Sequence, residues 1–75
     1  MAKLTPRPTQ RVLAALKRAG WRLRPGGGAR HYVLVHRQLP GIVTVPRHRK
    51  TPKKTLGLII KEAGLTLAAF EGLYR

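Results

Sequence analysis

The spacing of the apolar residues changes at Gly20, and this change constrains the fold more than any other feature. Residues 10–19 carry apolar side chains at the three- and four-residue intervals of an amphipathic helix. From residue 21 onward apolar and basic residues alternate, which is the period of a half-buried strand. Thr9 is a plausible N-cap for the helix, and Gly20 is expected to end it. The chain is therefore predicted to enter a sheet directly from a helix.

Three strands and two further helical segments are expected after Gly20. The strands are predicted at residues 21–24, 31–36 and 42–45, the last one ended by Pro46, and short turns between them indicate an antiparallel meander. Thr51 and Pro52 resemble the N-cap and first residue of a second helix, which Gly64 closes. Thr66 is expected to cap a short last helix.

The predicted fold class is α+β, in the order α-β-β-β-α, with the helices on one face of a three-stranded antiparallel sheet. The second helix would bury one stripe of apolar residues, namely Leu56, Ile59, Ile60 and Ala63. Alternation does not decide which face of strand 31–36 meets the helices, because both faces carry apolar residues. If His31 faces solvent, then Val33 and Val35 share its face.

Charge indicates the class of partner. Sixteen Lys and Arg residues against two acidic ones give a net charge of +14 in 75 residues, which favours a polyanion such as nucleic acid. The hydrophobic fraction of 43% is that of a globular protein, not of a disordered basic tail. The absence of cysteine excludes disulfides and thiol catalysis and fits a reducing cytoplasm. No apolar run is long enough to cross a membrane, so the expected location is cytoplasmic.

The shortage of acids excludes several kinds of nuclease. Glu62 and Glu71 are the two carboxylates, they lie far from the basic stretch in sequence, and each is expected to be a solvated helix charge. Hydrolysis by a carboxylate pair and two-metal catalysis both need more acidic residues than this. No metal and no cofactor are therefore expected.

Three histidines remain as candidates for proton transfer: His31, His36 and His48. Metal-free RNA cleavage needs a group that takes the 2′-hydroxyl proton, a group that protonates the leaving oxygen, and positive charge around the phosphate. His31 is the best placed, since it follows Arg30 and a glycine-rich turn. The turn leads into a strand, so it is not a P-loop. The turn is either a conformationally flexible hairpin connection between two strands or a loop that lets a phosphate backbone approach. Its residues are Gly26, Gly27, Gly28 and Ala29.

A basic stretch at residues 46–54 is either a solvated charge run or a track for phosphates. Its cations are Arg47, His48, Arg49, Lys50, Lys53 and Lys54. We favour the phosphate track, because the stretch opens a helix whose dipole also attracts anions.

Four segments together resemble the HicA family of toxin–antitoxin modules: "LKRAGW" (16–21), "GARH" (28–31), "VTVPRH" (43–48) and "TLGLIIKEAGLT" (55–66). The resemblance spans about residues 10 to 70 and implies one HicA-like domain over residues 1–75 with a double-stranded-RNA-binding-like fold. It also implies an mRNA interferase neutralised by a HicB-type antitoxin, with His31 as the catalytic histidine. Two positions depart from the family pattern: Ala29 stands where a serine is usual, and Lys54 where a glycine is more common.

The leading hypothesis is a toxin of a type II system that cleaves mRNA without a metal. His31 would act as general acid or base, with His48 as a possible second proton carrier. RNA would be bound by Arg30, Arg47, His48, Arg49, Lys50, Lys53 and Lys54. The alternatives are a non-catalytic RNA-binding module of the same fold and, behind it, a structural protein associated with DNA or the ribosome. The sequence does not predict an oligomeric state.

Overall fold

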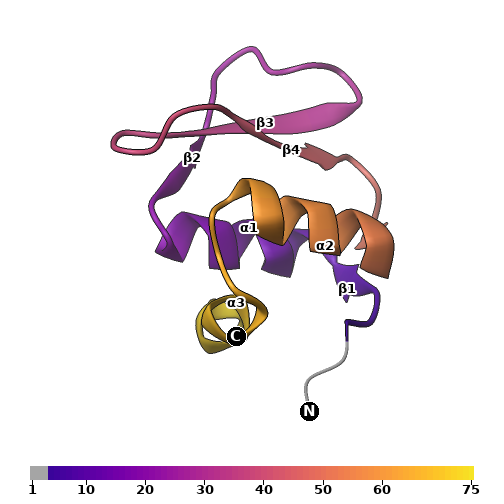
Figure 1. Ribbon diagram of the computed structural model, residues 1–75. Helices are drawn as coiled ribbons and strands as arrows, with labels where there is room; N and C mark the ends of the chain where they lie inside the picture. The colour runs from indigo at the N-terminus through magenta and orange to yellow at the C-terminus, as the bar shows by residue number, and fades with distance from the viewer. Residues whose placement is uncertain (1–3) are drawn as a thin grey trace.

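A three-stranded antiparallel sheet lies over two helices in the computed structural model, which describes residues 4–75 (Figure 1). A third helix lies on the side of these helices that faces away from the sheet. The elements, in chain order, are β1 (Arg7–Pro8), α1 (Thr9–Arg18), β2 (Trp21–Leu23), β3 (His31–His36), β4 (Val43–Pro46), β5 (Lys50–Thr51), α2 (Lys53–Glu62) and α3 (Leu67–Leu73). None of these helices is long and apolar enough to span a membrane.

The main sheet has the predicted meander order, β2-β3-β4. Leu34 of β3 lies opposite Leu23 on one side and Val43 on the other. Leu34 and Val43 are fully buried against the helices, so their face is the inner one. Because side chains alternate along a strand, His31, Val33 and Val35 point to the outer face. The structure thus settles which face of β3 meets the helices.

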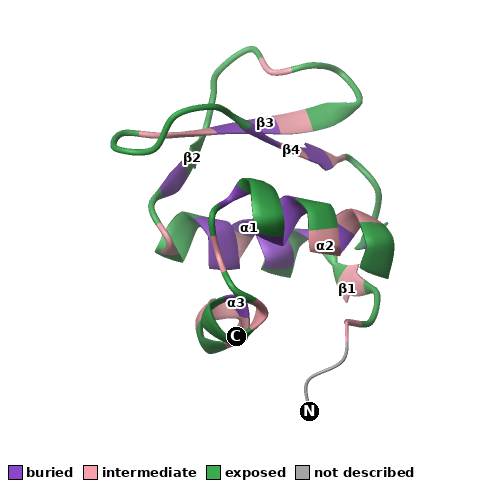
Figure 2. Ribbon diagram, viewed as in Figure 1, coloured by how far each residue is buried: buried purple, intermediate pink, exposed green. Residues whose placement is uncertain are grey.

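The apolar stripes of α1 and α2 supply the other half of the core (Figure 2). Each predicted residue of the α2 stripe is buried, and α1 contributes its own set. Burying one Leu or Ile side chain stabilises a fold by about 1.5–3 kcal/mol. The buried residues of the two helices are Thr9, Val12, Leu13, Ala15, Leu16, Leu56, Ile59 and Ile60, with Ala63 just after α2. The predicted α+β architecture is confirmed.

Gly20 makes the sharp passage from α1 into β2. Its φ of 98° lies in the left-handed region, and a Cβ built on it would be 2.5 Å from Nε2 of His36. A side chain is therefore excluded by conformation and by space. The turn delivers Trp21 into the core, where it is 1% exposed.

Four further predictions for helix ends, besides Gly20, can be compared with the structure. Gly64 follows α2 with a φ of 72°, as expected for a glycine that ends a helix. Thr66 is the expected N-cap of α3, because its hydroxyl accepts a hydrogen bond from Ala69 N. The other two N-cap predictions, Thr9 and Thr51, are wrong. Thr9 is the first helical residue, and the N-cap position belongs to Pro8. Thr51 lies in β5, and Pro52 occupies the N-cap of α2.

The two threonines instead bond to each other. Their hydroxyl oxygens are 2.9 Å apart and buried. Around them β1 pairs with β5 in a second, two-stranded antiparallel sheet that the sequence pattern did not predict. A buried hydroxyl needs a partner, and here a residue 42 positions away supplies it. The tertiary contact therefore replaces the local capping role.

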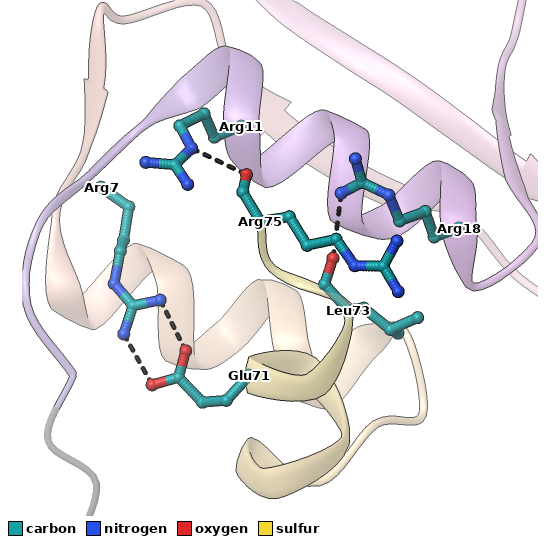
Figure 3. A network of polar contacts seen from close by, with 6 residues as sticks. All are labelled: Arg7, Arg11, Arg18, Glu71, Leu73 and Arg75. Atoms are coloured by element: carbon teal, nitrogen blue, oxygen red, sulfur yellow. Dashed lines mark hydrogen bonds and ion pairs between the residues drawn. The ribbon is translucent and has the colours of Figure 1, made fainter.

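Glu71 is not the solvated charge that we expected. Its carboxylate accepts two hydrogen bonds from the Arg7 guanidinium, at 2.7 and 2.8 Å (Figure 3). The same guanidinium lies 4.6 Å from the ring centroid of Tyr74. This bidentate ion pair ties α3 to the residues that precede α1.

Two arginines of α1 bind carbonyl oxygens at the C-terminal end of α3 and just beyond it (Figure 3). Arg18 donates to the carbonyl oxygen of Leu73 at 3.0 Å, and Arg11 donates to that of Arg75 at 2.8 Å. Carbonyls at a helix C-terminus lack helical partners and attract cations. These arginines are therefore part of the scaffold.

Substituting Glu71→Gln should lower the free energy of unfolding by about 1 kcal/mol at neutral pH. The hydrogen bonds from Arg7, aided by its charge, hold the pKa of the Glu71 carboxyl below its ordinary value of 4.5. A lowered pKa means that the pair stabilises the fold above that value and that this contribution is lost as the pH falls below it. Urea unfolding should show a larger difference between wild type and variant at pH 7 than at pH 3.

Glu62→Gln is the matched control, because Glu62 is exposed at the end of α2. It should match the wild type at both pH values. Equal stability of Glu71→Gln and the wild type at pH 7 would show that the ion pair contributes nothing.

Candidate active site

The pairing of β3 with β4 brings the glycine-rich turn and the basic stretch together. His31 lies opposite Pro46, and one residue further out Arg47 N donates to the carbonyl oxygen of Arg30 at 2.9 Å. The beginning of β3 and the end of β4 therefore form one end of the sheet, away from the hairpin that joins these strands (Figure 1). The predicted catalytic residue and the predicted phosphate track lie at this same end.

Residues 47–54, here called the basic segment, are anchored along their length. Thr9 N donates to the Arg49 carbonyl oxygen at 3.0 Å, and the next two residues form β5 against β1. The sequence predicted a loop here, but the segment includes a strand and runs into α2. Its backbone is held while its cationic side chains are exposed, namely Arg47, His48, Arg49, Lys50, Lys53 and Lys54.

No carboxylate neutralises this end of the molecule. Within residues 4–75 the single ion pair joins Arg7 to Glu71 at α3. The same residues contain no group of three or more His, Cys, Asp or Glu side chains that could hold a metal ion. The exposed cations of the basic segment thus have no acidic partner in the part of the chain that the structure describes. An anion is the complementary ligand.

His31 combines an exposed side chain with a fixed backbone. Its N–H donates to the Gly28 carbonyl oxygen at 3.4 Å, and the ladder with β4 begins at this residue. The hydrogen bonds found among residues 4–75 include none to its imidazole. Its two ring nitrogens are therefore available to a ligand.

The glycine-rich turn packs on the outer face of the sheet. A Cβ built on Gly27 would lie 3.4 Å from the backbone nitrogen of Val33 and 3.5 Å from one of its methyl groups. This cover explains why Val33 is only 7% exposed although it belongs to the outer face. Gly26 adopts a left-handed φ of 72°, while Gly28 and Ala29 are exposed. The packing of Gly27 on Val33 therefore fixes the position of the turn beside His31.

Arg47 differs from the other cations of the basic segment, because its guanidinium already has partners. Its central carbon lies 4.2 Å from the ring centroid of Tyr32, and its Nε donates to the Gly28 carbonyl oxygen at 3.3 Å. The Tyr32 hydroxyl accepts a hydrogen bond from Gln10 Nε2 at 3.2 Å. No spacing in the sequence links Tyr32 to Arg47, because the contact arises from the pairing of β3 with β4.

The structure separates the three histidines. His48 lies in the basic segment, near the His31 end of the sheet, and is exposed. His36 lies at the opposite end of β3, where its Nε2–H donates to the Ala19 carbonyl oxygen at 3.1 Å. Its Nδ1 accepts from the backbone of Gln38 at 3.0 Å, and its ring meets Trp21 edge-on at 5.2 Å. Both ring nitrogens of His36 are thus occupied by backbone groups, which indicates a structural role.

The sequence model of one protein family, described as HicA toxins of bacterial toxin–antitoxin systems, matches residues 9–65. The chain belongs to the HicA toxin family. The matched region runs from the start of α1 past the end of α2, so it includes the main sheet, the glycine-rich turn and the basic segment. The α+β fold agrees with the double-stranded-RNA-binding-like architecture expected for this family. No curated protein matches the chain.

Membership makes this HicA-family protein a toxin that pairs with an antitoxin. The match ends before α3, so this helix, to which Arg7, Arg11 and Arg18 donate hydrogen bonds at or just after its C-terminal end, lies outside the matched region. The candidate site lies entirely within it.

His36→Ala should lower the free energy of unfolding by about 2 kcal/mol. The substitution removes the edge-on contact with Trp21 and the hydrogen bonds to Ala19 O and Gln38 N. His48→Ala should leave stability unchanged, since its side chain is exposed. Urea unfolding followed by circular dichroism measures both variants. Equal midpoints for the two would contradict the structural role of His36.

Proposed function

We propose that this HicA-family toxin is a metal-independent endoribonuclease that cleaves mRNA, with His31 as the residue that transfers the proton. The observation that carries the proposal is an exposed imidazole, free of hydrogen bonds within residues 4–75, at the end of a cationic segment that has no carboxylate nearby. An mRNA substrate would place this activity in the cytoplasm.

The reaction that fits these groups is attack by the ribose 2′-oxygen on the adjacent phosphorus. A base takes the 2′-hydroxyl proton, the new P–O2′ bond forms, and the P–O5′ bond breaks. The leaving 5′-oxygen gains a proton, so that the products are a 2′,3′-cyclic phosphate and a 5′-hydroxyl. His31 can serve one of these two proton transfers. His48 is the candidate for the other, because it lies in the basic segment near the same end of the sheet.

RNA binding is assigned to Arg30 and to those Lys and Arg residues of the basic segment whose side chains have no bonding partner among the described residues. With Arg30, these are Arg49, Lys50, Lys53 and Lys54. Lys53 and Lys54 also form the first turn of α2, where the helix dipole attracts anions. Positive charge near the reacting phosphate offsets the negative charge that develops during cleavage.

The antitoxin partner that we propose is of the HicB type and covers the His31 end of the sheet. An inhibitor that covers this end would have to neutralise the basic segment, so its contact surface should be acidic.

A non-catalytic RNA-binding module remains the second candidate. Ala29 favours it, because the family turn normally has a serine at this place and alanine has no hydroxyl to orient a phosphate. Both candidates predict RNA binding through the same cations. Only cleavage separates them.

His31→Ala should lower the rate of RNA cleavage by about 10²–10⁴-fold, the range typical of one lost acid or base. Folding and RNA affinity should stay near the wild-type values, because the imidazole has no hydrogen bonds within the described residues. The assay is cleavage of a labelled mRNA in the presence of EDTA, with binding measured on a non-cleavable 2′-deoxy substrate. Lys61→Ala, exposed at the other end of α2, is the control. Cleavage by His31→Ala at the wild-type rate would overturn the assignment.

Lys53→Ala and Lys54→Ala together should weaken RNA binding and reduce its dependence on salt. Each lost phosphate contact should lower the slope of log affinity against log salt by about 0.7 for a single strand. Binding titrations from about 50 to about 300 mM salt, over which the Debye length shortens, measure this slope. An unchanged slope, with Lys61→Ala as the reference, would remove the first turn of α2 from the RNA interface.

A further inference from the structure

We propose that Arg47 is a positioning residue for His31 rather than one more phosphate contact. This inference deepens the proposed function and rests on it. It starts from a contrast within the basic segment. Both Arg47 and Arg49 are exposed, but the Arg47 guanidinium contacts the Tyr32 ring and the Gly28 carbonyl oxygen, whereas the Arg49 side chain has no bonding partner in the described residues.

Two hydrogen bonds of Arg47 go to residues that come just before His31 in the chain. Its side-chain Nε donates to the carbonyl oxygen of Gly28, and its backbone N donates to that of Arg30. The Gly28 oxygen also accepts the N–H of His31. Arg47 and the His31 backbone therefore share one acceptor, so a shift of Arg47 would move the turn that carries the imidazole.

The turn has no polar side chain of its own with which to fix this geometry. Residues 26–29 are three glycines and one alanine, which offer only backbone groups. Glycine also gives the chain more conformational freedom than any other residue. Hydrogen bonds from outside the turn must hold it, and Arg47 supplies one from its side chain.

Tyr32 keeps the Arg47 guanidinium in place. The ring is half-buried against the core, and its hydroxyl is bonded to Gln10 of α1. The guanidinium lies over this ring at 4.2 Å while its Nε reaches Gly28. A planar guanidinium can stack and donate from its edge at the same time, whereas the compact ammonium of lysine cannot. The arrangement thus requires arginine and not only a positive charge.

The test compares Arg47→Lys with Arg37→Lys, which both keep the charge; Arg37 is exposed just after β3, at the end opposite His31. Arg47→Lys should lower kcat for RNA cleavage by about 10–100-fold with KM nearly unchanged, since a small displacement of a catalytic group costs that much. Arg37→Lys should leave kcat unchanged. A rise in KM at constant kcat in Arg47→Lys would show that Arg47 binds phosphate, and would overturn the proposal.

Tyr32 provides a second pair of variants. Tyr32→Phe keeps the ring and should retain kcat, whereas Tyr32→Leu removes the stacking surface and should lose kcat as Arg47→Lys does. The double variant Arg47→Lys, Tyr32→Leu should be no slower than either single variant, because both remove the same support. Additive losses would show that the two residues act separately and would contradict the mechanism.

Amide hydrogen exchange keeps the proposal testable if the wild type proves not to cleave RNA. The His31 N–H should exchange faster in Arg47→Lys than in Arg37→Lys, because the turn that supplies its acceptor is loosened. Absence of cleavage by the wild type would defeat the proposed function alone. Unchanged exchange at His31 would defeat the role of Arg47, whatever the activity.

Discussion

The pairing register between β3 and β4 is the constraint on which the rest of the structure depends. It sets Leu34 opposite Val43 in the core and His31 opposite Pro46 at the outer end. A slip of one residue would turn every side chain of β3 to the other face and put His31 under the helices. The same register brings the Arg30 carbonyl to the Arg47 amide, so the glycine-rich turn meets the basic segment. Core and candidate site are thus two results of one alignment.

Periodicity predicted those elements whose residues bury a continuous apolar stripe. Strand 31–36 has the expected bounds, and the apolar stripe of α2 is buried as expected. Thr9 and Thr51 show where local rules fail. Each is a good N-cap by type, but their hydroxyls bond to each other across 42 positions of the chain. A pattern that covers a few neighbouring residues contains no information about such a partner, nor about the small sheet around it.

The residue types of the candidate site could be predicted from the sequence, but the separate roles of its individual arginines could not. The scarcity of acids and the place of His31 beside a glycine-rich turn can be read from the sequence. Arginines, in contrast, look alike in a sequence with 16 cations. Arg7 and Arg11 serve α3, and Arg47 lies on Tyr32, because folding brings each beside a carboxylate, a carbonyl or a ring. Only the folded chain distinguishes cations that support the scaffold from cations that are exposed and have no partner in the described residues.

The setting of Trp21 has a practical consequence for measurement. It is the single tryptophan of the chain, fully buried, with its ring against His36. His36 and His31 stand at opposite ends of β3, about 17 Å apart at the rise of an extended strand. The fluorescence of Trp21 should therefore report on the integrity of the core and be insensitive to a ligand at the His31 end of the sheet. The molecule contains its own optical reference, by which a loss of fold can be told from a loss of binding in one sample.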